Sequence, residues 1–68
     1  MNEEYFNMSI RKFLKSVGVQ SQREIEQAVA KALADGKLKG REKLVAKVTL
    51  TIDSLGVTRT IDGIIELE

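Results

Sequence analysis

Apolar residues in the first quarter of the chain recur with helical spacing. Five of them are separated by 4, 3, 1 and 3 residues, which places them on one face of a helix: Phe6, Ile10, Phe13, Leu14 and Val17. Asn2 suits the N-cap of this helix, and Gly18 suits the left-handed position after its C-terminus, with Val19 folding back onto Leu14. The pattern predicts a helix over about residues 3–17.

A second helical pattern follows almost at once. Ser21 to Glu24 reads S-x-x-E, the sequence of a capping box, in which Ser21 and Glu24 each accept a backbone N–H. The apolar positions that follow keep the helical period: Ile25, Ala28, Val29, Ala32 and Leu33. Asp35-Gly36 should end this helix, so the sequence predicts helices over about 3–17 and 22–35 joined as a helical hairpin.

From Leu44 onward the apolar period changes to two, as in a β-strand. Asp53–Gly56 fits a four-residue hairpin loop with glycine at positive φ. That loop sets a register in which apolar residues face apolar residues, threonines face threonines and lysines face acids. The pairs are Ile52 with Val57, Val48 with Ile61, Leu44 with Ile65, Thr51 with Thr58, Thr49 with Thr60, Lys47 with Asp62 and Lys43 with Glu66. The sequence therefore predicts a β-hairpin over about residues 44–67.

These elements predict an α+β fold of order α-α-β-β in a single domain, residues 1–68. The helical hairpin is expected to pack on one face of the two-stranded antiparallel β-hairpin. The expected core holds the apolar residues of those faces: Phe6, Ile10, Phe13, Leu14, Val17, Ile25, Val29, Leu33, Leu44, Val48, Leu50, Ile52, Val57, Ile61 and Ile65.

The composition excludes several classes of function. The chain has no cysteine and no histidine, so it lacks a thiolate, a zinc–sulfur site and a side chain that titrates near neutrality. No activating base exists for its serines, and its carboxylates form no metal-binding loop. We therefore expect no enzyme activity, no cofactor and no metal. The acidic N-terminus and the short apolar runs predict a cytoplasmic protein without a signal peptide or membrane span.

A basic connector, residues 36–43, joins the predicted helices to the hairpin. Because Lys43 faces an acid in the hairpin register, the unpaired charges are Lys37, Lys39 and Arg41. These three residues could bind phosphates. In this alternative the two predicted helices form a degenerate helix-turn-helix, with the hairpin as its wing. Its base-reading residues would be an exposed row on the second helix: Arg23, Gln27 and Lys31. Against this alternative, Glu24 and Glu26 share that helix and the net charge is only +1.

The preferred interpretation is a non-catalytic interaction module. A two-stranded sheet has two open edges, through which a second copy or another protein partner could add a strand. Four apolar residues lie outside the expected core and are candidates for such an interface: Tyr5, Met8, Val45 and Ile64.

Three stretches of the chain resemble a known family: FNMSIRKFLK, VGVQSQREIE and TLTIDSLG. The family consists of short bacterial proteins of about this length and is described only as a domain of unknown function. The resemblance covers nearly the whole chain. It implies a bacterial, cytosolic protein and carries no activity, ligand or site.

Overall fold

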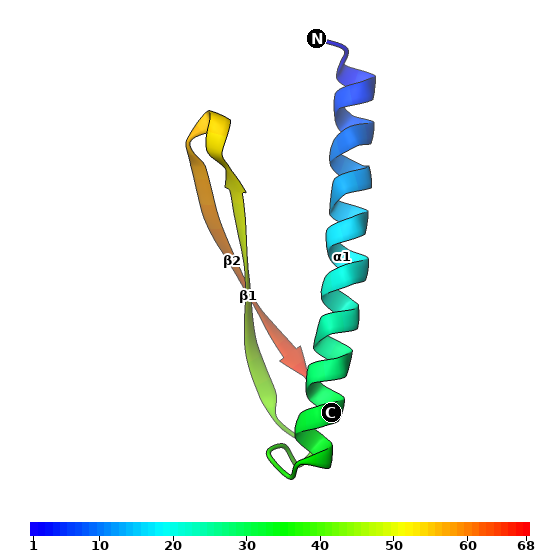
Figure 1. Cartoon of the computed structure of the whole chain (residues 1–68), viewed down its shortest axis with the longest axis vertical. Helices are drawn as coiled ribbons and strands as arrows, with labels where there is room; N and C mark the ends of the chain where they lie inside the picture. Colours follow the sequence, from blue (N-terminus) through cyan, green and yellow to red (C-terminus); the bar gives the residue numbers. More distant parts are fainter. The chain divides into compact units, whose positions relative to one another are not determined.

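The computed structural model describes residues 1–68 and shows an α+β fold with one helix and one two-stranded antiparallel sheet (Figure 1). The elements follow in the order α1 (Glu3–Ala34), β1 (Lys43–Ile52), the short 3₁₀ helix η1 (Asp53–Leu55) and β2 (Val57–Glu66). The chain divides into two compact units, Met1–Lys37 and Leu38–Glu68. The first unit contains α1, and the second contains the β-hairpin.

The predicted helical hairpin is wrong, because α1 is one continuous helix of 32 residues (Figure 1). Its start agrees with the prediction: the Asn2 side chain accepts hydrogen bonds from the N–H groups of Glu4 (3.0 Å) and Tyr5 (3.2 Å). Gly18 does not end a helix, since positive φ occurs only at Gly36, Gly40 and Gly56.

The continuity of α1 through Gly18 has a physical explanation. Glycine inside a helix costs about 1 kcal/mol relative to alanine, whereas a helix end leaves four backbone groups to be satisfied on each side. No proline is present to force that break. The expected capping box does not form, because Ser21 lies inside α1, and the Gln20 Nε2 donates to Ser16 Oγ (2.8 Å) across the predicted break.

The glycine ending that was predicted at Gly18 is found eighteen residues later. Gly36 has φ 76°, and its N–H donates to the Leu33 carbonyl at 3.2 Å. The Lys37 N–H donates to the Ala32 carbonyl at 2.8 Å. These two bonds are those of a Schellman motif, which satisfies the last carbonyls of the helix. Asp35-Gly36 therefore ends α1, as the sequence predicted.

The β-hairpin confirms the predicted register at every pair. Ile52 faces Val57, Val48 faces Ile61, Leu44 faces Ile65, Thr51 faces Thr58, Thr49 faces Thr60, Lys47 faces Asp62 and Lys43 faces Glu66. The predicted loop is also confirmed: Gly56 has φ 63°, and its N–H donates to the Asp53 carbonyl at 3.1 Å. Alternation of apolar and polar residues fixes this register, because a slip of one residue would exchange the two faces.

Neither unit buries a side chain by itself. Phe13 remains 54% exposed and Ile61 remains 59% exposed. The reason lies in the number of layers. A core forms between two packed layers, and each unit by itself supplies only one, a single helix or a single two-stranded sheet.

The helical conformation of Gly18 predicts opposite effects for two glycine substitutions. A Cβ at Gly18 meets nothing within 4 Å, so Gly18→Ala should raise the stability of α1 by about 1 kcal/mol. Gly36→Ala is the matched control and should lower stability by about 1 kcal/mol, because Gly36 has φ +76°. Thermal unfolding followed by far-ultraviolet circular dichroism measures both. Destabilisation by Gly18→Ala would mean that residue 18 is a turn.

Candidate interaction surface

One face of α1 carries an apolar stripe along most of its length. At 100° per residue its members fall within an arc of about 120°. We call it the α1 stripe, and it consists of Phe6, Ile10, Phe13, Leu14, Val17, Ser21, Ile25, Ala28 and Ala32. Its large residues are open to solvent, at 50% for Phe6, 54% for Phe13 and 55% for Leu14. Such a contiguous apolar surface is uncommon on a monomeric protein unless it binds something.

The β-hairpin has one apolar face as well. Directly opposed residues of an antiparallel pair lie on the same face, so the register defines it. Its apolar members are Leu44, Ala46, Val48, Leu50, Ile52, Val57, Ile61 and Ile65. Arg59 is the only charged residue on this face, where it stands opposite Leu50. A two-stranded sheet with such a face is marginally stable in water by itself.

The four predicted interface residues are all exposed. Tyr5 (71%) and Met8 (63%) lie three residues apart on α1. Val45 (72%) and Ile64 (56%) face each other across the hairpin, on the face opposite to the apolar one. The structure therefore brings these residues together as two pairs, one in each unit.

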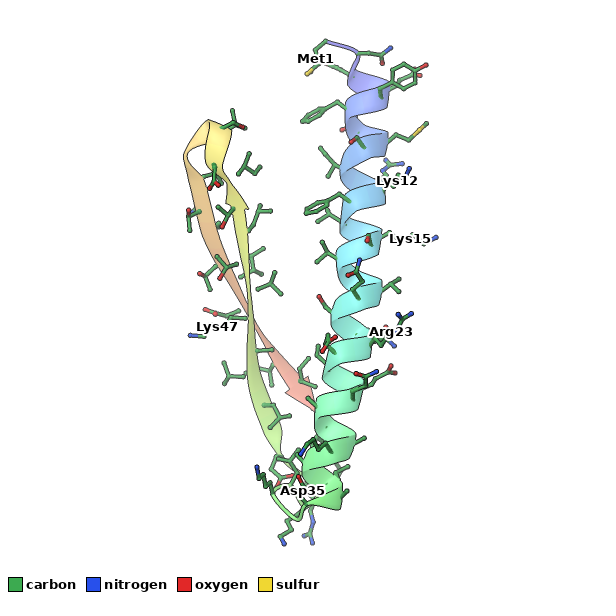
Figure 2. All side chains as sticks on the ribbon, viewed as in Figure 1. Met1, Lys12, Lys15, Arg23, Asp35 and Lys47 are labelled. Carbon is green, nitrogen blue, oxygen red and sulfur yellow. The ribbon has the colours of Figure 1, made fainter.

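The residues predicted to contact nucleic acid are distributed over both units. Arg23, Gln27 and Lys31 share one side of α1, as their spacing of four requires. Arg23 projects from the same side of α1 as Lys12 and Lys15 (Figure 2). The predicted pair of helices does not exist, so this row belongs to one long helix and not to a helix-turn-helix.

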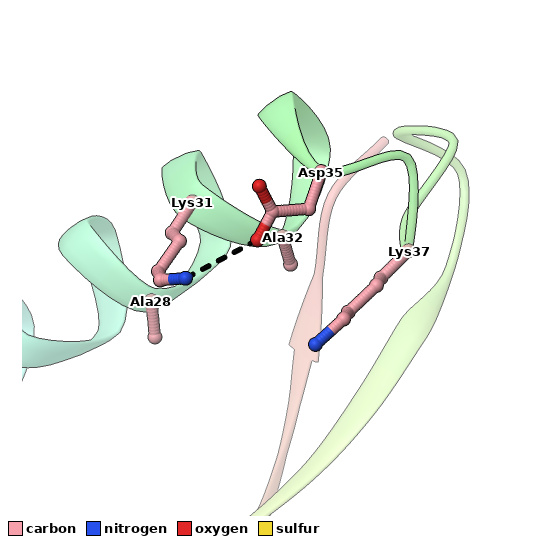
Figure 3. Close-up of a pocket in the computed structure, with 5 residues that line it drawn as sticks. All are labelled: Ala28, Lys31, Ala32, Asp35 and Lys37. Atoms are coloured by element: carbon pink, nitrogen blue, oxygen red, sulfur yellow. Dashed lines mark hydrogen bonds and ion pairs between the residues drawn. The ribbon is translucent and has the colours of Figure 1, made fainter.

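Lys31 is engaged within the chain. Its Nζ lies 3.2 Å from Asp35 Oδ2, with the two side chains 78% and 44% exposed. The pair flanks a shallow, open depression of about 210 Å³ lined by Ala28, Lys31, Ala32, Asp35 and Lys37 (Figure 3). Because this ion pair is exposed, it contributes little to stability. The depression has no buried polar group that would orient a ligand.

The basic connector binds an anion that belongs to the chain itself. The Glu42 carboxylate accepts hydrogen bonds from three successive backbone N–H groups, those of Lys39 (2.8 and 3.1 Å), Gly40 (3.0 Å) and Arg41 (3.1 Å). Gly40 has φ 99°, a conformation open to glycine that turns these amides toward one point. Consecutive amides of this kind form an anion-binding concavity, or nest. In this chain Glu42 occupies it.

The nest lowers the pKa of Glu42. The hydrogen bond from the Lys39 amide is the largest cause, and the other amides act in the same direction. The sequence analysis treated Glu42 only as the one acid among the basic residues. The signal for its role was present in K-G-R-E, where an acid follows two residues after a glycine. Side chains of this type commonly bond to nearby backbone N–H groups.

The remaining lysines of the basic stretch behave in part as predicted. Lys43 and Lys47 stand opposite Glu66 and Asp62. Neither pair closes to within the 4.0 Å of an ion pair, which only Lys31 and Asp35 reach. Opposite charges across the strands therefore favour the register without forming fixed contacts.

Two further observations concern metals and membranes. No group of three or more acidic side chains is arranged to hold a metal ion. No helix combines the length and the apolar character that crossing a membrane requires.

The lowered pKa of Glu42 predicts that the connector amides of the natural protein respond to acid and that those of Glu42→Gln do not. The Glu42 carboxylate stabilises the connector above its unfolded-state pKa, and this contribution is lost as pH falls through the lower folded-state pKa. Acid should therefore shift the Lys39 and Gly40 amide resonances of the natural protein. In Glu42→Gln these two resonances should stay nearly constant, because no charge titrates. Two-dimensional NMR between pH 7 and pH 2 measures this.

The matched control is Glu24→Gln, which removes a carboxylate of α1 that accepts none of these amides. It should leave the titration of the Lys39 and Gly40 amides unchanged. An unchanged titration in Glu42→Gln would show that Glu42 does not occupy the nest.

Comparison with known proteins gives one match. The model of a family described as "Family of unknown function (DUF6494)" matches residues 1–68, the whole chain. No curated protein and no solved structure shows a significant match. The match agrees with the resemblance found in the first-helix, turn and hairpin stretches. The chain belongs to the family of unknown function DUF6494.

Proposed function

We propose that this protein is a small non-catalytic interaction module of the bacterial cytoplasm, which binds protein through its exposed apolar faces and self-associates. The observation that carries the proposal is that neither unit buries a side chain by itself, although 43% of the residues are hydrophobic. Each apolar CH₂ group moved out of water contributes about 0.8 kcal/mol. A partner that covers the α1 stripe or the apolar face of the hairpin would supply this stabilisation.

The open edges of the hairpin are the surfaces proposed for adding a strand from a second copy. The Leu67 N–H donates to the Glu42 carbonyl, so residues 42 and 67 form a hydrogen-bonded pair. Such pairs alternate with pairs whose amides point outward. In this register the backbone amides of Thr49 and Thr60 therefore point outward from the hairpin, whereas the backbone groups of Leu50 and Arg59 bond each other. An incoming strand would use the outward amides.

The side-chain inventory supports the non-catalytic part of the proposal. General acid–base catalysis at neutral pH uses groups whose pKa lies near 7. The chain has no histidine and no cysteine, and the pKa of the Glu42 carboxyl group is lowered by its bonds to backbone amides.

Nucleic-acid binding is the second candidate, and one observation favours it. Arg23 and Gln27 lie on one exposed side of α1, next to Lys31. Arginine and glutamine side chains can read base edges, and lysine can contact phosphate. Lys37, Lys39 and Arg41 could add phosphate contacts.

Proline substitutions test the proposed strand edge. Thr49→Pro should preserve the hairpin and weaken self-association, because it removes an outward amide. Leu50→Pro is the matched control and should disrupt the hairpin, since the Leu50 amide lies within the ladder. Sedimentation velocity over a wide concentration range measures association, and cross-strand NMR contacts report the hairpin.

One outcome would contradict the strand edge as the interface, and another would contradict self-association itself. Self-association that is unchanged by both Thr49→Pro and Thr60→Pro would remove the edge as the interface. A natural protein that remains monomeric at millimolar concentration would remove self-association altogether.

An oligonucleotide titration tests the second candidate. If the chain binds nucleic acid, amide shifts at low salt should be confined to Arg23–Lys31 and Lys37–Arg41, and they should fade as salt is added. The double substitution Lys37→Glu and Lys39→Glu should weaken this binding, because it reverses two charges of the connector. No shifts with duplex or single-stranded DNA at low salt would exclude this function.

A further inference from the structure

The amides of the nest converge on a single oxygen atom. The N–H groups of Lys39, Gly40 and Arg41 all donate to Glu42 Oε1, at 3.1, 3.0 and 3.1 Å. The second oxygen, Oε2, accepts only from the Lys39 N–H, at 2.8 Å. Three amides aimed at one point favour an anion there, because their partial positive charges add. All four residues belong to the unit Leu38–Glu68, so this geometry does not depend on α1.

The nest stands in a segment with surplus positive charge. Residues 36–47 hold five basic side chains, and Glu42 is their only acid. Lys39 and Arg41 are exposed, and neither takes part in an ion pair. A single carboxylate therefore occupies a site whose own residues bring three amide donors and two cations.

We propose that the nest is a binding site for a phosphate dianion, and that Glu42 is an internal competitor that occupies it when phosphate is absent. This site does not rest on the proposed self-association, so the two stand or fall separately. A phosphate group offers three strong acceptor oxygens and more than one negative charge at neutral pH. A carboxylate offers two oxygens and one charge, so phosphate matches the three amides and two cations better than Glu42 does.

The backbone of Glu42 is held independently of its side chain. Its carbonyl accepts the Leu67 N–H at 3.2 Å, which fixes Glu42 at the end of the hairpin ladder. Rotation of the side chain alone therefore vacates the nest, without a change in the strand register. Gly40 keeps the amides in place, because its φ of 99° lies in a region that favours glycine.

The competition with Glu42 selects the form of phosphate. Inorganic phosphate and phosphate monoesters carry more than one negative charge at neutral pH, whereas each phosphodiester of nucleic acid carries one. A diester has no advantage in charge over the carboxylate that it must displace. We therefore assign the site to inorganic phosphate or a phosphate monoester, and not to a nucleic-acid backbone.

Two-dimensional NMR with inorganic phosphate at pH 7 and constant ionic strength tests the site. In Glu42→Gln the amide resonances of Lys39, Gly40 and Arg41 should shift and saturate. The natural protein should need roughly tenfold more phosphate, because a nest that is free for about a tenth of the time binds with a tenth of its intrinsic affinity. In the natural protein, excess phosphate should also move the ¹³C resonance of the Glu42 side-chain carboxyl group, which reports the displacement without any substitution.

Gly40→Ala is the control for the backbone geometry. It keeps every charged side chain, and its Cβ would meet nothing within 4 Å, but alanine is strained at φ +99°. Added to Glu42→Gln, it should weaken phosphate binding by about tenfold, because the amides no longer converge. Gly63→Ala is the matched control at a glycine without positive φ and should leave phosphate binding unchanged.

Two further ligands separate the sources of phosphate. If the site takes monoesters, O-phosphoserine should bind Glu42→Gln with an affinity comparable to that of inorganic phosphate. Binding of inorganic phosphate alone would restrict the site to the free ion. A single-stranded oligonucleotide that shifts these amides more strongly than either, at equal phosphate concentration, would overturn the preference for a dianion and favour the second candidate function.

Three results would overturn the site itself. The first is the absence of saturable amide shifts in both Glu42→Gln and Glu42→Ala while the cross-strand NMR contacts remain intact. The second is equal phosphate binding with and without Gly40→Ala, which would assign the phosphate to the basic side chains and not to the nest. The third is a Glu42 carboxyl resonance that excess phosphate does not move. Residues 39–42 would then form a turn and no ligand site.

Discussion

The structure of this protein depends on one constraint: an isolated helix or hairpin cannot bury its own apolar face. A single helix satisfies its own backbone hydrogen bonds, and so does the inner side of a two-stranded sheet, but neither can cover its own apolar face. In this chain α1 and the hairpin each have such a face, and neither unit buries a side chain by itself. The hydrophobic contribution that normally stabilises a domain is therefore largely unused within each unit.

Short-range polar contacts define where the elements begin and end. Asn2 caps the start of α1, and Gly36 closes its end. Glu42 binds the amides of the connector, and Gly56 closes the hairpin loop. Each contact joins residues at most five positions apart, so none needs a core to form. These contacts define the elements of each unit without help from the other unit.

Local rules also explain which parts of the structure could be predicted from the sequence. The hairpin register followed from alternation and loop length, because a wrong register would oppose Lys47 to an apolar residue. The N-cap at Asn2 and the end at Gly36 followed from their residue types. In each case, neighbours in the sequence determine the outcome, and no distant contact changes it.

The prediction failed where two local signals competed with a continuous helix. Gly18 and the Ser21–Glu24 sequence both resemble a helix boundary, yet the backbone continues with helical hydrogen bonds through them. Without the helical hairpin, the helical part of the chain is one layer and has no core of its own. Glu42 was overlooked because the K-G-R-E sequence was interpreted only by its charges, and the possible bonds to backbone amides were not considered.

The locality of the pairing has a consequence for how the protein forms. Strand residues pair only across the Asp53–Gly56 loop, and α1 bonds only to itself. Chains with such low contact order fold in microseconds to milliseconds. On the ribosome α1 can be complete before the second strand has been synthesised. A step in which a second protein covers an apolar face would be bimolecular, so its rate would depend on protein concentration, whereas the formation of α1 and of the hairpin does not.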